Sequence, residues 1–267
     1  MFILAIETTG PYGSVALLDE KGNVLGCEAS HGTMSHLKDL IPMVDTMLKK
    51  CGVSKKEIAL LAPSVGPGSF TGIRIGVSTA RALCQALGIK AVPVPTLEAF
   101  TFKKTAAAQT RGEGVESGCH TAVCAILNAR RGQVYGMIDG FMEPGPYMLI
   151  DVLDVYKSKM EADGWKLLFF GDGIDAYEKN IKEALGEPGP GPEACYEFAP
   201  ADDRYQDAVS VGKWAAERIR QAGGAASGLD GVAVDYEKLL PDYMRRAEAE
   251  QKLERGELPI CKGPKQE

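Results

Sequence analysis

Residues 65–76 spell VGPGSFTGIRIG, and they join an apolar run over 58–65 to an amphipathic pattern over 73–87. This order predicts a strand, a glycine turn and a helix. Gly66 and Gly68 permit positive φ or the close approach of another backbone. A helix start behind such a turn is electropositive and accepts an anion in some proteins, whereas in others the turn only connects two packed elements. This stretch alone does not decide between an anion site and a connecting turn, and it favours the connecting turn.

The same turn offers hydroxyl groups to the free N–H groups of the helix that follows. Ser69 and Thr71 stand where a helix cap is expected. The complete signature turn consists of Gly66, Pro67, Gly68, Ser69, Phe70, Thr71 and Gly72.

Composition excludes several classes of protein. The chain has 267 residues, 45% hydrophobic and 25% charged, which is ordinary for a globular protein. A formal net charge of −6 disfavours nucleic-acid binding by the field of the whole protein. The seven cysteines are irregularly spaced and form no C-x-x-C pair, which indicates a reducing compartment. With no basic leader and no apolar run of about 20 residues, we expect a cytoplasmic protein without a membrane partner.

The order of predicted elements indicates two α/β units. The first unit has predicted strands at 2–8, 14–20, 24–30, 58–65 and 91–96, and predicted helices at 35–51, 73–87 and 96–104. The second has predicted strands at 121–130, 133–142, 165–171 and 196–200, and predicted helices at 151–163, 175–185 and 208–221. Both units begin with paired strands and continue into helix, strand and helix, so we expect two lobes, each a mixed sheet flanked by helices.

We place the lobe boundaries where periodicity is lost. The first lobe spans 1–105 and the second 106–206, with residues 103–120 as a linker or surface loop. The helix within 207–223 is expected to pack back on the first lobe, and 224–267 forms a C-terminal tail.

A second turn, ETTGPYGS over 7–14, is the strongest candidate for intrinsic chemistry. Its N–H groups and the hydroxyls of Thr8, Thr9 and Ser14 are candidates to cradle a phosphate, and Glu7 is a candidate to hold a hydrated magnesium ion. The turn contains no lysine or arginine and departs from the Walker pattern, so the sequence favours a plain hairpin turn over a phosphate site.

The sequence contains no pattern typical of a metal site or of a catalytic nucleophile. The three histidines do not have ligand spacing, no H-E-x-x-H or G-x-S-x-G pattern occurs, and Ser69 is better explained as a helix cap. We therefore predict neither a metal site nor a catalytic residue in this chain. The remaining signal is apolar: methionines lie around the helix at 35–51, as core filling or as an adaptable partner surface.

Several segments together resemble one family. The glycine motif, the opening ILAIETT, the helix HLKDLIP, the segment NARRGQVY and the tail PDYMRRAEAE resemble the TsaB family of the bacterial tRNA threonylcarbamoyladenosine machinery, once labelled glycoprotease-like. The resemblance spans nearly the whole chain. It implies a two-lobed actin-like (ASKHA, ribonuclease H-like) fold with a degenerate nucleotide site.

The resemblance also implies a function within a complex. TsaB-like chains bind and activate TsaD, a paralogue that holds the metal and transfers threonylcarbamoyl to N6 of adenosine 37 in tRNAs reading ANN codons. A third protein, the ATPase TsaE, docks on that pair. ATP or ADP and the metal are then expected in the partner subunits and none in this chain alone, with tRNA reached only through the complex and a homodimer expected when the chain is alone.

Individual positions agree with a non-catalytic paralogue. Where TsaD-like chains carry a metal-binding H-x-x-x-H, this sequence has Thr96 and Phe100, and neither side chain replaces an imidazole ligand. Glu7 and Asn128 stand where TsaB-like chains commonly have aspartate, which weakens a claim of magnesium–nucleotide binding. The alternatives are an actin-like ATPase or phosphotransferase that uses the 7–14 turn, and a peptidase, for which no metal site or triad exists.

The resemblance implies that two first-lobe helices join the partner in a four-helix bundle. We expect their residues to divide between the core and that interface, with Met47 as an exposed position. The expected contact residues are Met34, Leu37, Leu40, Ile41, Val44, Met47, Ile73, Arg74 and Val77.

Overall fold

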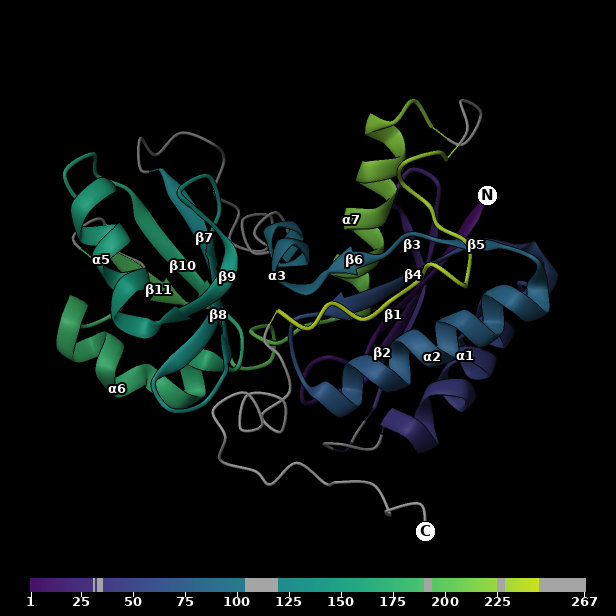
Figure 1. Cartoon of the computed structure of the whole chain (residues 1–267), viewed down its shortest axis with the longest axis horizontal. Helices are drawn as coiled ribbons and strands as arrows, with labels where there is room; N and C mark the ends of the chain where they lie inside the picture. The colour runs from purple at the N-terminus through teal and green to yellow at the C-terminus, as the bar shows by residue number, and fades with distance from the viewer. Residues whose placement is uncertain (31, 33–35, 104–119, 190–193, 225–228, 245–267) are drawn as a thin grey trace, which may run out of the picture.

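The computed structural model describes residues 1–30, 32, 36–103, 120–189, 194–224 and 229–244. Two lobes lie side by side, each built on one mixed sheet (Figure 1). The first sheet has the order β3-β2-β1-β4-β5, and β6 pairs with β4. Its strands are β1 (Phe2–Glu7), β2 (Ser14–Asp19), β3 (Val24–Ala29), β4 (Ile58–Gly66), β5 (Lys90–Ala91) and β6 (Val94–Pro95).

The second sheet repeats this arrangement. Read from its opposite edge, its order is β9-β8-β7-β10-β11, with an antiparallel meander followed by two parallel strands, as in the first sheet. The strands are β7 (Thr121–Asn128), β8 (Gln133–Ile138), β9 (Met142–Met148), β10 (Lys166–Phe170) and β11 (Tyr196–Phe198). The repeated topology confirms the predicted two-lobed, actin-like α/β fold.

Helices cover both faces of the first sheet. Leu4 and Ile6 pack under α1 (His36–Cys51) and α2 (Phe70–Leu87), whereas Ile3 and Ala5 pack under α7 (Ala208–Gln221). Because both faces of β1 are buried, its sequence is continuously apolar instead of alternating. Figure 1 shows α1 and α2 on one side of this sheet and α7 on the other.

The second lobe is covered on one face by its own helices and on the other by the first lobe. Helices α5 (Leu149–Lys159) and α6 (Gly173–Leu185) pack on one face. On the other face lie Leu97 of α3 (Thr96–Ala99) and Phe100, whose ring centroid is 5.9 Å from that of Phe170. The lobes therefore share an apolar core instead of meeting across an open cleft at this point.

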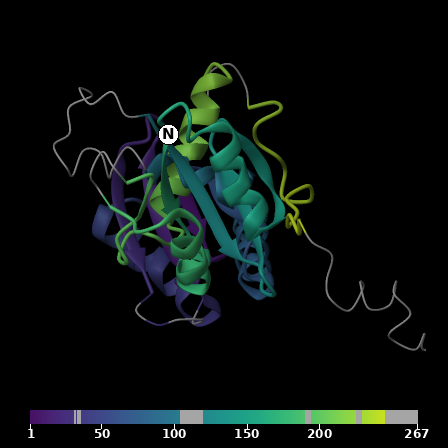
Figure 2. The same ribbon diagram turned by 90° about the vertical axis from the view of Figure 1, so that its left-hand side faces the viewer.

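The chain returns to the first lobe near its end. Val234 forms a bridge with Ala91, Leu239 is buried in the core under α1 and α2, and the N–H of Asp242 donates to the carbonyl of Val65 at 2.8 Å. Figure 2, in which the second lobe faces the viewer, shows this yellow segment along one side of the molecule. The described part of the predicted tail, 229–244, is thus an integral part of the first lobe.

Three element predictions differ from the structure for local reasons. Helix α2 begins at Phe70 instead of Ile73, because Ser69 caps it by accepting the N–H of Gly72 at 3.2 Å. The predicted strand at 91–96 is divided into β5 and β6. Strand β9 was not predicted because it contains prolines, which its position at the edge of the sheet accommodates. Within the described residues, no helix is long and apolar enough to cross a membrane.

The stability of the first lobe provides a test of the glycine turn. A Cβ atom at Gly72 would overlap the carbonyl oxygen of Thr8, a backbone atom that cannot swing away. We expect Gly72→Ala to lower the free energy of unfolding by about 3 kcal/mol, measured by chemical denaturation. Gly88→Ala is the matched control, because Gly88 has open space around it and only a φ of +68° to accommodate, costing about 1 kcal/mol. Equal losses in the two variants would contradict the packing argument.

Candidate functional site

The glycine turn packs directly against the β1–β2 turn. The N–H of Ser69 donates to the carbonyl of Thr9 at 2.8 Å, and the hydroxyl of Thr8 donates to the carbonyl of Gly72 at 2.8 Å. The Cβ position of Gly68 lies 2.6 Å from the carbonyl oxygen of Thr9. The start of α2 therefore faces a carbonyl of the same chain, in the place where an anion would otherwise sit.

The four phosphate-site candidates come together, but they are buried. Glu7, Thr8, Thr9 and Ser14 are all at most 8% exposed. The hydroxyl of Ser14 accepts the N–H of Ala208 at 2.9 Å, and the carboxylate of Glu7 accepts the N–H of Thr9. A phosphate cradle needs N–H and hydroxyl groups that face a ligand. In this structure the hydroxyls of Thr8 and Ser14 and the N–H of Thr9 bond within the chain, which is the arrangement expected of a plain hairpin turn.

Glu7 belongs to a small buried polar cluster. The hydroxyls of Ser64 and Thr96 lie 2.7 Å apart, and the hydroxyl of Thr96 donates to that of Thr9 at 3.4 Å. Burial raises the pKa of Glu7 above its ordinary value, against the opposing effect of its hydrogen bonds. Oε2 of Glu7 has no hydrogen-bond partner within the described part of the chain.

Thr96 and Phe100, the positions that the family resemblance sets against the metal ligands of TsaD-like chains, make other contacts. Thr96 joins the polar cluster around Glu7, and Phe100 packs between the lobes against Phe170. Among the described residues, no group of three or more His, Cys, Asp or Glu side chains is arranged to hold a metal ion.

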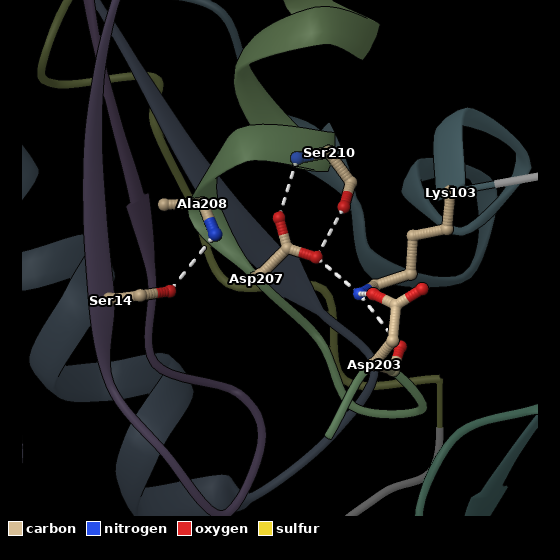
Figure 3. Close-up of polar contacts among 6 residues, drawn as sticks. All are labelled: Ser14, Lys103, Asp203, Asp207, Ala208 and Ser210. Atoms are coloured by element: carbon tan, nitrogen blue, oxygen red, sulfur yellow. Dashed lines mark hydrogen bonds and ion pairs between the residues drawn. The ribbon is translucent and has the colours of Figure 1, made fainter. Parts of the chain in front are cut away.

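An ion-pair cluster around a buried lysine joins the end of the described first-lobe segment to the segment that leads into α7. Lys103 is 6% exposed, and its Nζ lies 2.9 Å from Oδ1 of Asp203 and 2.5 Å from Oδ2 of Asp207 (Figure 3). Asp207 also caps α7, accepting the N–H and the hydroxyl of Ser210 at 2.8 Å and 2.7 Å. Burial opposes ionisation of Asp207, but the Lys103 ammonium outweighs it and holds the pKa of that carboxyl below its ordinary value. We call Lys103, Asp203 and Asp207 the clasp.

The segment that carries the clasp also bonds to the second lobe. Nη1 of Arg204 and the hydroxyl of Tyr205 both donate to the carboxylate of Asp175 in α6, at 2.8 Å and 2.7 Å. The N–H of Gly171 donates to the carbonyl of Arg204 at 2.6 Å. Residues 203–207 therefore fix the first lobe, the second lobe and the start of α7 to one another.

Sequence reasoning missed the clasp, for a physical reason. Lys103 was assigned to the edge of a linker, because a lone lysine beside a low-complexity stretch is usually solvated. The available signal was Asp207, which stands directly before the predicted helix at 208–221, where aspartate is a favoured cap.

The predicted partner-binding residues separate into two groups. The first group is buried in the core of the first lobe, so its members are not surface contacts as predicted. It consists of Leu40, Val44, Met47, Ile73 and Val77. Met47 is 1% exposed and lies against β3, 3.6 Å from the Cβ position of Gly26, so Met47→Glu would disrupt the core and does not test an interface.

The second group remains at the surface. Ile41 is 43% exposed on α1, and Arg74 is exposed on α2. Arg74 contacts the returning chain, where its Nε donates to the hydroxyl of Tyr243 at 2.9 Å. Within α2, its guanidinium carbon lies 3.8 Å from the centre of the Phe70 ring. Met34 and the side chain of Leu37 lie outside the described residues.

The clasp predicts a large effect of a single substitution. Lys103→Met leaves two carboxylates partly buried without their cation, and we expect it to lower the free energy of unfolding by about 3–5 kcal/mol. Lys182→Met, which removes surface ion pairs with Glu178 and Glu187, is the control and is expected to change the free energy of unfolding far less. The free energies of unfolding of the two variants are measured by chemical denaturation. If Lys103→Met loses as little stability as Lys182→Met, the clasp does not hold the lobes.

Glu7 predicts a pH dependence of stability. Because its folded-state pKa is raised above the ordinary value of 4.5, folding favours the protonated acid. The stabilisation that protonated Glu7 contributes is complete below pH 4.5, and it is lost as the pH rises through the raised pKa of the folded state. We expect Glu7→Gln to be more stable than the natural chain at pH 8 by about 1–3 kcal/mol, with the difference shrinking toward pH 4. Parallel stability curves for the two proteins between pH 4 and pH 8 would contradict this assignment.

Comparison with known proteins places the chain among its relatives. It is 30% identical, over 94% of its length, to the tRNA threonylcarbamoyladenosine biosynthesis protein TsaB of Bacillus subtilis, and the match covers 97% of that protein. It is 36% identical to TsaB of Escherichia coli over 51% of this chain and 53% of that protein. YeaZ from Pseudomonas aeruginosa shares the fold, with a TM-score of 0.62 and 22% identity over 91% of this chain and 99% of that one.

A model of a related family also matches part of this chain. Residues 28–160 match the family described as TsaD, tRNA N6-adenosine threonylcarbamoyltransferase. The match to the Bacillus subtilis protein, in contrast, extends over nearly all of both chains. The chain therefore belongs to the TsaB family of tRNA threonylcarbamoyladenosine biosynthesis proteins.

Proposed function

We propose that this chain is a non-catalytic subunit that binds and activates a TsaD protein. In this role it forms part of a complex with TsaD and the ATPase TsaE that transfers threonylcarbamoyl to N6 of adenosine 37 in tRNAs reading ANN codons. The observation that carries the proposal is the closed glycine turn: the amide of Ser69 and the hydroxyl of Thr8 bond to carbonyls of the same chain. A turn that is filled in this way positions a helix and does not hold a phosphate.

The exposed side of α1 and α2 supports the choice of partner surface. The two helices lie together on the outer face of the first sheet, away from α7 and from the second lobe (Figure 1). Their outward positions include Ile41, which is 43% exposed, Pro42, and Phe70, which is 42% exposed. Exposed apolar side chains on a rigid helical pair are typical anchors of a helix–helix interface.

The same proposal assigns the cofactors to the partner subunits. ATP or ADP and the catalytic metal bind TsaD and TsaE, and tRNA is reached through the complex, in keeping with the net charge of −6 of this chain. In the absence of TsaD, the outer surface of α1 and α2 pairs with a second copy. The complex acts in the cytoplasm.

The proposed interface with TsaD is tested by placing a charged side chain at an exposed position of α1. We expect Ile41→Glu to weaken binding to TsaD of the same organism at least about tenfold, because a buried carboxylate without a partner opposes association. Ile150→Glu is the matched control, since Ile150 is 54% exposed on α5 of the second lobe. Affinity is measured by calorimetry and folding by thermal unfolding. Unchanged affinity in Ile41→Glu, or equal weakening in both folded variants, would exclude this surface.

The alternative function is an actin-like ATPase or phosphotransferase that uses the β1–β2 turn. It requires Thr8 and Thr9 to leave the buried positions in which they are bonded to α2. Calorimetric titration of the isolated chain with ATP and magnesium separates the two functions. The proposed scaffold role predicts no saturable binding, whereas micromolar binding accompanied by ATP turnover would overturn it.

A further inference from the structure

The segment that returns to the first lobe near the end of the chain also reaches the outer surface of α2. Leu239 is buried under α1 and α2, and the N–H of Asp242 donates to the carbonyl of Val65 at 2.8 Å. A Cβ atom at Gly66 would overlap the carbonyl oxygen of Asp242, so the segment packs closely on the glycine turn. These contacts fix the backbone that leads into Tyr243.

The side chain of Arg74 on α2 is held by two aromatic residues. Its guanidinium carbon lies 3.8 Å from the centre of the Phe70 ring and 5.8 Å from the centre of the Tyr243 ring. Its Nε donates to the hydroxyl of Tyr243 at 2.9 Å, and the centroids of the two rings are 4.9 Å apart. An exposed arginine ordinarily samples many rotamers, whereas these contacts hold the guanidinium in one place. We call Phe70, Arg74 and Tyr243 the arginine cluster.

The arginine cluster presents hydrogen-bond donors without acceptors. The guanidinium of Arg74 forms no ion pair with any acidic side chain in the described part of the chain. The hydroxyl of Tyr243 accepts from Arg74, so its own hydrogen is available, and no residue that the structure describes accepts it. Guanidinium and phenol donors that lie next to each other are complementary to a carboxylate, which accepts several hydrogen bonds at once.

The rings of the arginine cluster distinguish a free anion from an acidic side chain of another protein. Phe70 is 42% exposed and Tyr243 is 36% exposed. A small anion leaves these rings in water, whereas a carboxylate that projects from a protein surface brings apolar neighbours that cover them. Arginine and tyrosine are also among the residues that most often dominate the affinity of a protein interface. These observations favour a protein partner.

We propose that Arg74 binds a carboxylate of the partner protein through its two terminal nitrogens. This inference rests on the proposed function, and it adds the chemistry of the partner, which is an aspartate or glutamate of TsaD with apolar residues beside it. It also makes the returning segment part of the interface. Tyr243 serves the same carboxylate, because it holds the guanidinium and offers a hydroxyl beside it.

The test is a calorimetric titration of the full-length chain with TsaD of the same organism. Arg74→Gln removes the charge and keeps part of the side chain, and we expect it to weaken binding at least about tenfold. Arg74→Lys keeps the charge without the planar fork and is expected to recover only part of that loss. The affinity of the natural chain is expected to fall more steeply with salt concentration than that of Arg74→Gln.

Arg218→Gln is the matched control. Arg218 is an exposed arginine whose guanidinium carbon lies 5.5 Å from the centre of the Trp214 ring, and it belongs to α7 on the opposite face of the first sheet (Figure 1). We expect this variant to bind TsaD as the natural chain does. Thermal unfolding verifies that each variant is folded before the affinities are compared.

A double-mutant cycle tests the part played by Tyr243. Tyr243→Phe removes the hydroxyl and keeps the ring, and we expect it to weaken binding about threefold. In the Arg74→Gln background the same change is expected to have little further effect, because the hydroxyl and the guanidinium serve one carboxylate. If the two losses multiply instead, Tyr243 does not act together with Arg74, and the returning segment is wrongly assigned to the interface.

The outcomes separate this inference from the proposed function. If the natural chain binds TsaD and Arg74→Gln binds equally well, the arginine cluster lies outside the interface, and only this inference is overturned. Equal weakening in Arg74→Gln and Arg218→Gln would show a general effect of charge and would overturn it as well. If the natural chain does not bind TsaD at all, the proposed function fails, and this inference fails with it.

Discussion

The close contact between the glycine turn and the β1–β2 turn is the constraint on which the first lobe depends. Only residues without Cβ atoms allow the start of α2 to approach the carbonyls of Thr8 and Thr9. The approach fixes where α2 begins and at what angle it crosses the sheet. It also uses the hydrogen-bonding groups that an actin-like protein would need for a phosphate. The same packing therefore explains both the fixed position of α2 and the closed form of the β1–β2 turn.

The relation between the lobes depends on a second, electrostatic constraint. Lys103, the last described residue before the second lobe, forms an ion-pair cluster with Asp203 and Asp207, which lie just before α7. Buried charges favour one geometry strongly, because each one loses its hydration and needs its partners in place. Together with the apolar contact of Phe100 and Phe170, the clasp holds the second lobe in a defined position relative to α1 and α2.

Much of the fold was predictable from local pattern, and the site was not. Strand β4, which lacks polar interruptions, and helix α7, with its clear period and its aspartate cap, have the predicted bounds to within one residue. Met47 was wrongly placed at the surface, because methionines around a helix do not reveal that β3 covers that side. The clasp joins residues about a hundred positions apart, and the docking of Leu239 depends on the finished sheet. Such long-range contacts leave no periodic signal in the sequence.

The central claim is that this chain is required for threonylcarbamoyl transfer although it contributes no reacting group. The most direct test is reconstitution of tRNA modification with TsaD and TsaE of the same organism, with and without this chain. The account predicts negligible transfer without the chain, and full transfer when either the natural chain or its Glu7→Gln variant is added. Transfer at the same rate without the chain would contradict the claim, as would loss of transfer with a folded Glu7→Gln variant that still binds TsaD.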